Sequence, residues 1–66
     1  MSKEEEKIRT LLDYWIEHNN EHGQEFREWS EKMKDADKPV VSAELLQASM
    51  EMDKATEHLL AARERL

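Results

Sequence analysis

The apolar residues of this chain recur every three or four positions over two long stretches, which a short polar segment separates. In the first stretch the repeat falls at Ile8, Leu12, Trp15, Asn19, His22, Phe26, Trp29 and Met33. In the second stretch it falls at Val41, Leu45, Ala48, Met52, Ala55, Leu59, Ala62 and Leu66. An average spacing of 3.5 residues is typical of helices that pack along one seam. The pattern therefore predicts two long helices, and no stretch alternates as a strand does.

The polar segment between the two stretches holds the main cluster of helix-breaking residues, Lys34-Asp35-Ala36-Asp37-Lys38-Pro39. Proline disfavours a helical conformation in the residue before it and suits the first turn of a helix. We therefore predict one domain over residues 1–66, with a helix over about 3–34, a loop over about 35–39 and a helix over about 40–65. Ser2 and Glu5 form a candidate capping box for the first helix. Asp35, Asp37 or Ser42 is expected to cap the second.

The two predicted helices should fold back on each other as an antiparallel hairpin, so the fold class is all-α. Folding the chain about residue 37 places His22 opposite Met52 and Trp29 opposite Leu45. Two helices cannot hide all of the large apolar residues from water, and further ones lie beside the seam. These are Tyr14, Ile16, Leu46, Met50 and Leu60. We therefore expect two hairpins to associate as a homodimeric four-helix bundle, with the tryptophans in its core.

Charge and composition limit the classes of function that are expected for this chain. The formal net charge is −6, from 16 acidic and 10 basic residues, and an acidic chain is repelled by nucleic-acid phosphates. No apolar run is long enough to cross a membrane, and the polar N-terminus does not resemble a signal peptide. The chain contains no cysteine, which removes disulfides and thiolate metal sites. These features predict a cytoplasmic protein that binds neither nucleic acid nor membranes.

The first seam becomes polar in its middle, at His18, Asn19 and His22. Residues four apart lie on the same face of a helix, so the two imidazoles could share one ligand. His58 on the second helix is expected near the same level. Neutral imidazoles are ligands for zinc, nickel or copper. The pattern thus predicts a divalent metal site at His18, His22 and His58, with Glu51 or Glu25 as an alternative third ligand, and a dimer could duplicate the histidine pair.

The same polar residues have a second interpretation without a metal. Asn and His side chains in a helical seam fix the register and the oligomeric state through hydrogen bonds, at some cost in stability. The protein would then be a structural or protein-interaction module, and the tryptophans of an exposed hairpin could anchor a protein partner. Ser30, Ser42 and Ser49 are isolated in sequence and are expected at helix surfaces or caps.

An enzymatic function is not expected. The segment His18-Asn19-Asn20-Glu21-His22 reads H-x-x-E-H, which is the motif of the inverted zinc peptidases. Those enzymes are large and require a distal carboxylate ligand and a substrate cleft, which a hairpin of 66 residues cannot form. The sequence also contains no glycine-rich phosphate loop and no CxxC pair.

The segment Trp15-Ile16-Glu17-His18-Asn19-Asn20-Glu21-His22, followed by Phe26 and Trp29, resembles a family of short, uncharacterised prokaryotic helical-hairpin domains. The family pattern is H-W-I-E-H-N-x-E-H, then an aromatic residue and W-A, then a second helix rich in alanine, leucine and glutamate. The resemblance implies a loose association with metal handling. Tyr14 stands where the pattern has another histidine, and Ser30 stands where it has an alanine.

Overall fold

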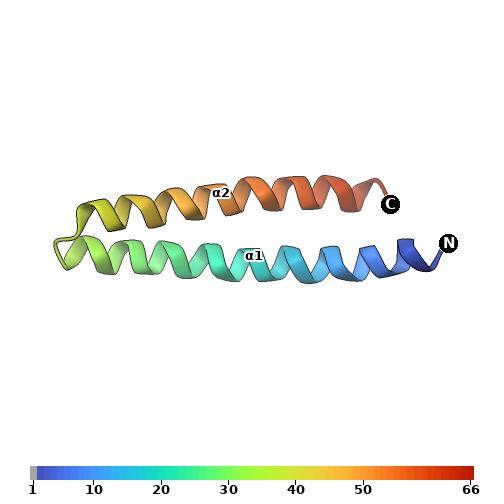
Figure 1. Ribbon diagram of the computed structural model, residues 1–66, viewed down its shortest axis with the longest axis horizontal. Coiled ribbons are helices and arrows are strands. Elements are labelled where there is room, and N and C mark those ends of the chain that lie inside the picture. The colour runs from blue at the N-terminus through green and yellow to red at the C-terminus, as the bar shows by residue number, and fades with distance from the viewer. Residues whose placement is uncertain (1) are drawn as a thin grey trace.

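The computed structural model describes residues 2–66, so Met1, which the predicted domain includes, lies outside the described residues. Within that range the chain forms two α-helices and no strand: α1 spans Lys3–Asp35 and α2 spans Pro39–Glu64. The helices run antiparallel as a hairpin, with both chain ends at the same end of the molecule (Figure 1). The fold is therefore all-α, and the loop covers residues 36–38. Neither helix of this range has a stretch that is both long and apolar enough to span a membrane.

The helix ends differ in how their backbone groups are satisfied. The Ser2 side chain accepts a hydrogen bond from the Glu5 N–H, which caps α1 as predicted. At the other end of α1, the Lys38 N–H donates to the Met33 carbonyl and the Asp37 N–H to the Lys34 carbonyl. These two bonds form a Schellman motif, whose left-handed position is usually a glycine but here is Asp37, with φ of 61°.

The expected caps of α2 are not formed. Its N-cap residue is Lys38, which makes no side-chain capping bond, and Pro39 occupies the first helical turn. Ser42 lies inside the helix and hydrogen-bonds to α1 instead of capping. The Schellman turn already fixes the path of the chain between the helices, and proline needs no partner for the N–H that it lacks.

The seam between α1 and α2 is rotated by about one residue from the predicted one. Trp15 is 38% exposed and Trp29 is 50% exposed, so the prediction that both tryptophans lie in the seam is wrong. The buried residues of the two helices are instead Leu12, Gly23, Ser30, Ser49 and Thr56. Ser30 and Ser49 are therefore interior residues, and not the surface residues that were predicted. Leu12 is the only buried hydrophobic side chain among the described residues.

Small side chains and polar contacts explain this rotation. The Ser30 hydroxyl donates to the carbonyl oxygen of Ser42 across the seam, at 2.8 Å. A Cβ atom added to Gly23 would lie 3.8 Å from the Met52 Cβ, so Gly23, and not His22, faces Met52. The axial register is thus within one residue of the predicted one. Ion pairs join the helices on one flank, between Asp13 and Arg63 and between Arg27 and Asp53.

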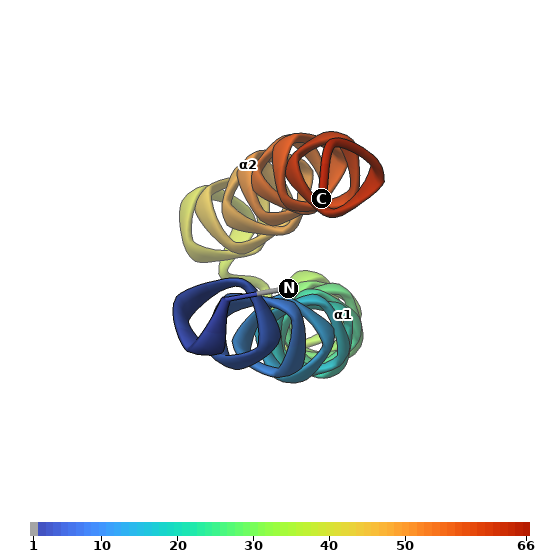
Figure 2. The same ribbon diagram turned by 90° about the vertical axis from the view of Figure 1, so that its right-hand side faces the viewer.

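The hairpin is a rod. Its Cα atoms extend over 53 × 14 × 11 Å, and its radius of gyration is 15.4 Å. A compact domain of this length would have a radius of gyration of about 11 Å. Viewed end-on, α2 crosses α1 at a shallow angle (Figure 2). A rod that is only two helices wide has little interior, which is why most of its large apolar side chains remain in contact with solvent.

Candidate functional site

The most specific constellation in the structure is the pair His18 and His22 on α1. Their Nε2 atoms lie 2.9 Å apart, and their rings meet edge to face with centroids separated by 4.3 Å. The pair follows from the helix itself, because side chains four residues apart project from the same face one turn apart. His18 is exposed and His22 is half-buried, so both imidazoles can be reached from solvent.

The two histidines form the middle of a ladder of four rings. Tyr14 stacks on His18 with centroids 5.4 Å apart, and His22 stacks on Phe26 at 6.1 Å. The ladder runs obliquely across α1, from exposed Tyr14 to Phe26, which is half-buried in the seam. These neighbours limit the rotation of both imidazole rings. The sequence prediction missed this arrangement, although the spacing of four residues between successive rings was a visible signal.

The Glu25 carboxylate lies near the edge of the His22 ring that faces away from His18. The Glu25 Oε1 atom is 3.8 Å from the Nδ1 atom of His22, whose Nε2 atom faces His18. The two nitrogens of the His22 ring are therefore differentiated: one is directed to a carboxylate and the other to the second histidine.

Asn19, which was predicted within the seam, is half-buried there between the turns that carry Leu12 and Phe26.

The third predicted ligand is not brought to this pair within one chain. His58 is exposed on α2, and residues 2–66 contain no group of three or more His, Cys, Asp or Glu side chains that could hold a metal ion. Glu51, the alternative ligand, interacts with its neighbours Gln47 and Lys54. One hairpin thus supplies two imidazoles and no third ligand.

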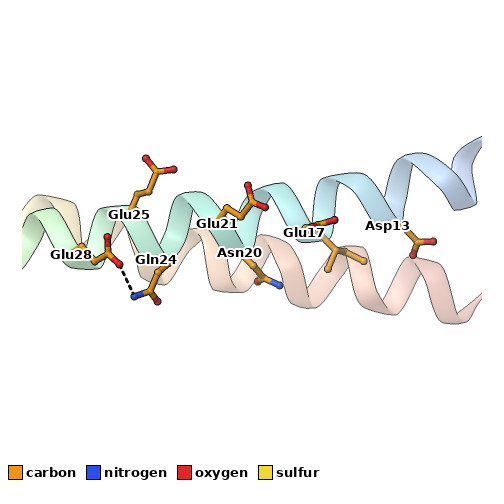
Figure 3. A pocket seen from close by; sticks show the side chains of 8 residues that line it. Asp13, Glu17, Asn20, Glu21, Gln24, Glu25 and Glu28 are labelled. Atoms are coloured by element: carbon orange, nitrogen blue, oxygen red, sulfur yellow. Dashed lines mark hydrogen bonds between the residues drawn. The ribbon is translucent and has the colours of Figure 1, made fainter.

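A shallow hollow follows the outer surface of α1 beside the histidines. Its lining residues are Asp13, Ile16, Glu17, Asn20, Glu21, Gln24, Glu25 and Glu28. Figure 3 shows that the carboxylates spread along the helix instead of converging, and that Glu21 and Glu25 extend away from Asn20 and Gln24. Glu28 accepts a hydrogen bond from Gln24. Asp13 is paired with Arg63. The hollow is acidic, but its side chains do not form a coordination sphere.

A protein-family model matches most of the chain. A family model described as a domain of unknown function (DUF8180) matches residues 8–66, which include nearly all of α1 and the whole of α2. No curated protein and no solved structure matches the chain significantly. The histidine pair therefore lies inside the matched domain.

Proposed function

The chain belongs to the DUF8180 family, a domain of unknown function, and we propose that it is a small helical-bundle protein that binds a divalent transition-metal ion through His18 and His22. Zinc and nickel are the ions that imidazole ligands of this kind suit best. Under this proposal the protein is a metal-binding protein and not an enzyme. The observation that carries the proposal is the convergence of the two Nε2 atoms.

The separation of these atoms is close to the one that a shared metal ion requires. Zinc binds histidine nitrogen at about 2.0–2.1 Å, so two nitrogens of a tetrahedral site lie about 3.3 Å apart. The observed distance is 2.9 Å. A change of a few tenths of an ångström, which a small rotation of either ring provides, would place both nitrogens on one ion. The pair is therefore nearly preorganised, and little conformational freedom is lost when the metal binds.

The surroundings of His22 support the same proposal. Histidines that bind metals usually donate their second ring N–H to a carboxylate or a carbonyl, which fixes the tautomer and strengthens the ligand. Glu25 stands on the Nδ1 side of His22, at 3.8 Å, so it can orient the ring in this way. That arrangement leaves the Nε2 atom, on the His18 side, with the lone pair that a metal ion needs.

A second candidate function is a metal-free interaction module. The exposure of Trp15 and Trp29 favours it, because large aromatic side chains often anchor protein interfaces. In this case the two imidazoles share a proton through a simple hydrogen bond, which contributes about 0.5–1.5 kcal/mol at most. Asn19 and the histidines would then serve only to select the register and the oligomeric state.

Thermal unfolding in the presence of metal ions tests the first proposal. An ion that binds only the folded protein adds about 2.7 kcal/mol at a hundred times its dissociation constant. Each kcal/mol moves Tm by about 4–8 °C in a domain of this size. Zinc or nickel should therefore raise Tm clearly, and a chelator should reverse the shift. Magnesium and calcium, which prefer oxygen ligands, should have little effect. The shift should also shrink as the solution is acidified, because protons compete with the metal ion for the imidazole nitrogens.

Variants separate the histidine pair from nonspecific binding. His18→Ala and His22→Ala should each fold and lose most of the shift. Asn20→Ala is the matched control, because this exposed residue lies on the same helix between the two histidines. If wild type does not respond to zinc, nickel or copper in molar excess, or if the double variant H18A/H22A responds equally, the metal proposal is wrong. The interaction module would then be the better description.

A further inference from the structure

The chain presents a second helical stripe beside its own seam. On α1, Trp15, His22 and Trp29 each precede a seam residue, and Leu11 and His18 continue the same spacing of three and four. On α2 the residues that precede the seam positions 42, 49 and 56, and position 63, which continues their spacing, are small: Val41, Ala48, Ala55 and Ala62. In an antiparallel pair, residues that precede the seam in this way lie on the same flank of both helices. We call these nine residues the tryptophan flank.

The ion pairs confirm that this flank is distinct from the other one. Arg27 and Asp53, which are 3.8 Å apart, each follow a seam residue instead of preceding one. They therefore mark the flank opposite the tryptophans. The tryptophan flank carries large side chains from α1 and small ones from α2, and Trp15, Trp29 and Val41 on it are all more than a third exposed.

We propose that a second copy of this chain covers the tryptophan flank and that its His58 completes the metal site formed by His18 and His22. This inference rests on the proposed function for its metal. It names the partner and the missing ligand, neither of which the single hairpin supplies. A two-fold axis parallel to the helices would place α1 of each copy against α2 of the other.

The accessible surface area of the hairpin supports a second copy of the chain as the partner that covers the tryptophan flank. The accessible surface of the hairpin is 5269 Å². A compact monomer of this mass exposes about 4400 Å², so the hairpin has an excess of roughly 850 Å². A stable interface of ordinary size buries about 800 Å² on each partner. Pairing two tryptophan flanks would therefore bring the surface of each chain to the value that is usual for a folded protein.

Shape supports the same pairing. With the axis parallel to the helices, the tryptophans of one copy pack on the alanines of the other, so large side chains oppose small ones.

The register within one chain predicts which side chains meet across this interface. Asp13 pairs with Arg63, and Gly23 faces Met52, so residue 18 is level with residue 58. Rotation about an axis parallel to the helices does not change a residue's position along them. His18 and the partner copy's His58 therefore lie at the same height on adjoining helices. Each dimer would then hold two equivalent sites, each with two imidazoles from one copy and one from the other.

The nearby carboxylates also fit a cation at this place. By the same register, Glu25 is level with the partner copy's Glu51. Two carboxylates that face each other across an interface repel, and a divalent ion bound beside them would offset this repulsion. A water molecule or the partner copy's Glu51 can occupy the fourth position of a tetrahedral site.

Complementation between variants tests the shared site. His58→Ala removes one of the three imidazoles and should weaken zinc binding by at least about 10–100-fold. H18A/H22A should bind no zinc. Mixing these two proteins should recover about a quarter of the wild-type zinc capacity if the chains pair at random, because each mixed dimer contains one complete site. Titration calorimetry measures the zinc-binding capacity per chain. The two variants have to be mixed at a concentration at which the dimers exchange chains.

Arginine substitutions test the interface independently of the metal. Ala55→Arg places a long charged side chain on the tryptophan flank, and Ala43→Arg is the matched control on the outer face of α2. Both alanines are exposed in the hairpin, so both variants should fold. In light scattering with size exclusion, wild type and Ala43→Arg should be dimers and Ala55→Arg a monomer.

The possible failures are distinguishable. If H58A binds zinc as wild type does while H18A/H22A does not, the shared site is wrong and the proposed function stands. If mixing the variants recovers nothing, His58 acts within its own chain. A wild-type monomer, or a dimer that Ala43→Arg disrupts and Ala55→Arg does not, excludes the tryptophan flank as the interface. A wild type that binds no zinc overturns the proposed function itself.

Discussion

The Ser30 hydroxyl donates a hydrogen bond to the carbonyl oxygen of Ser42, 2.8 Å away on the other helix, and the two serine hydroxyls are 3.0 Å apart. Ser30 is 6% exposed, so this contact lies inside the seam. It ties the two helices together close to the turn. A polar contact of this kind fixes how α1 is rotated against α2, because a buried hydroxyl without a partner would be costly.

Replacing Ser30 should therefore weaken the hairpin. Ser30→Ala removes the hydroxyl and its bond to the partner helix, and we expect the free energy of unfolding to fall by about 1 kcal/mol. Ser42→Ala should cost less, because the Ser42 carbonyl remains available to Ser30. Urea denaturation followed by circular dichroism at one protein concentration measures both changes. Equal effects of the two substitutions would show that the carbonyl bond contributes little.

Replacing Gly23 should have the opposite effect. A Cβ atom at this position would lie 3.7–3.9 Å from its nearest neighbours, which is ordinary van der Waals contact. Alanine is favoured over glycine in the middle of a helix by about 1 kcal/mol. Gly23→Ala should thus raise Tm by about 4–8 °C. A lower Tm would mean that the helices approach each other more closely here than the structure indicates.

The turn offers a second stabilising substitution. Asp37 has a left-handed backbone, with φ of 61°, at the position where a Schellman motif usually has glycine. This conformation costs a residue with a Cβ atom about 1–2 kcal/mol, although aspartate tolerates it better than most. Asp37→Gly should therefore be neutral or stabilising, whereas Asp37→Val should lower Tm. A melting comparison of the two variants checks the sign, and a more stable valine variant would contradict the turn geometry.

The rotation of the seam changes what aromatic substitutions should do. Leu12 is a buried apolar residue in the seam, and Leu12→Ala should cost about 2–5 kcal/mol, enough to unfold most of a domain of this size. Trp29 is half-exposed, and the Lys32 Nζ atom lies over its ring, 4.3 Å from the centroid. Trp29→Ala should leave the dilute hairpin nearly as stable and should instead reduce its self-association. Melting at several protein concentrations separates these effects, since only association makes Tm depend on concentration.

The sequence pattern predicted the helices, the turn and the axial register, but it could not choose the rotation. The series Trp15, His22, Trp29 has the same spacing as the series Ile16, Gly23, Ser30, so periodicity alone is compatible with either seam. Hydrophobicity favoured the tryptophans. The hairpin instead buries the smaller residues, which let the helices approach and form the Ser30–Ser42 contact.

Only the part of the candidate site that lies on one helix could be predicted from the sequence. The contact between His18 and His22 depends only on local helix geometry, so the spacing of four residues was sufficient to predict it. The place of His58 depends on how the two helices are rotated and on what covers them. A pattern along one chain contains no information on either, and the ring ladder from Tyr14 to Phe26 was visible in the spacing but was overlooked.

The sparse apolar content of the seam has a calorimetric consequence. The heat capacity of unfolding comes mainly from apolar surface that becomes hydrated, and it is usually about 12–15 cal/mol/K per residue. Residues 2–66 of the isolated hairpin bury one hydrophobic side chain, so its heat capacity of unfolding should lie well below this value. Its stability should therefore vary little between cold and warm solution. Covering the tryptophans would add to the heat capacity of unfolding. Calorimetry at rising protein concentration should therefore show this heat capacity increase as the chains associate.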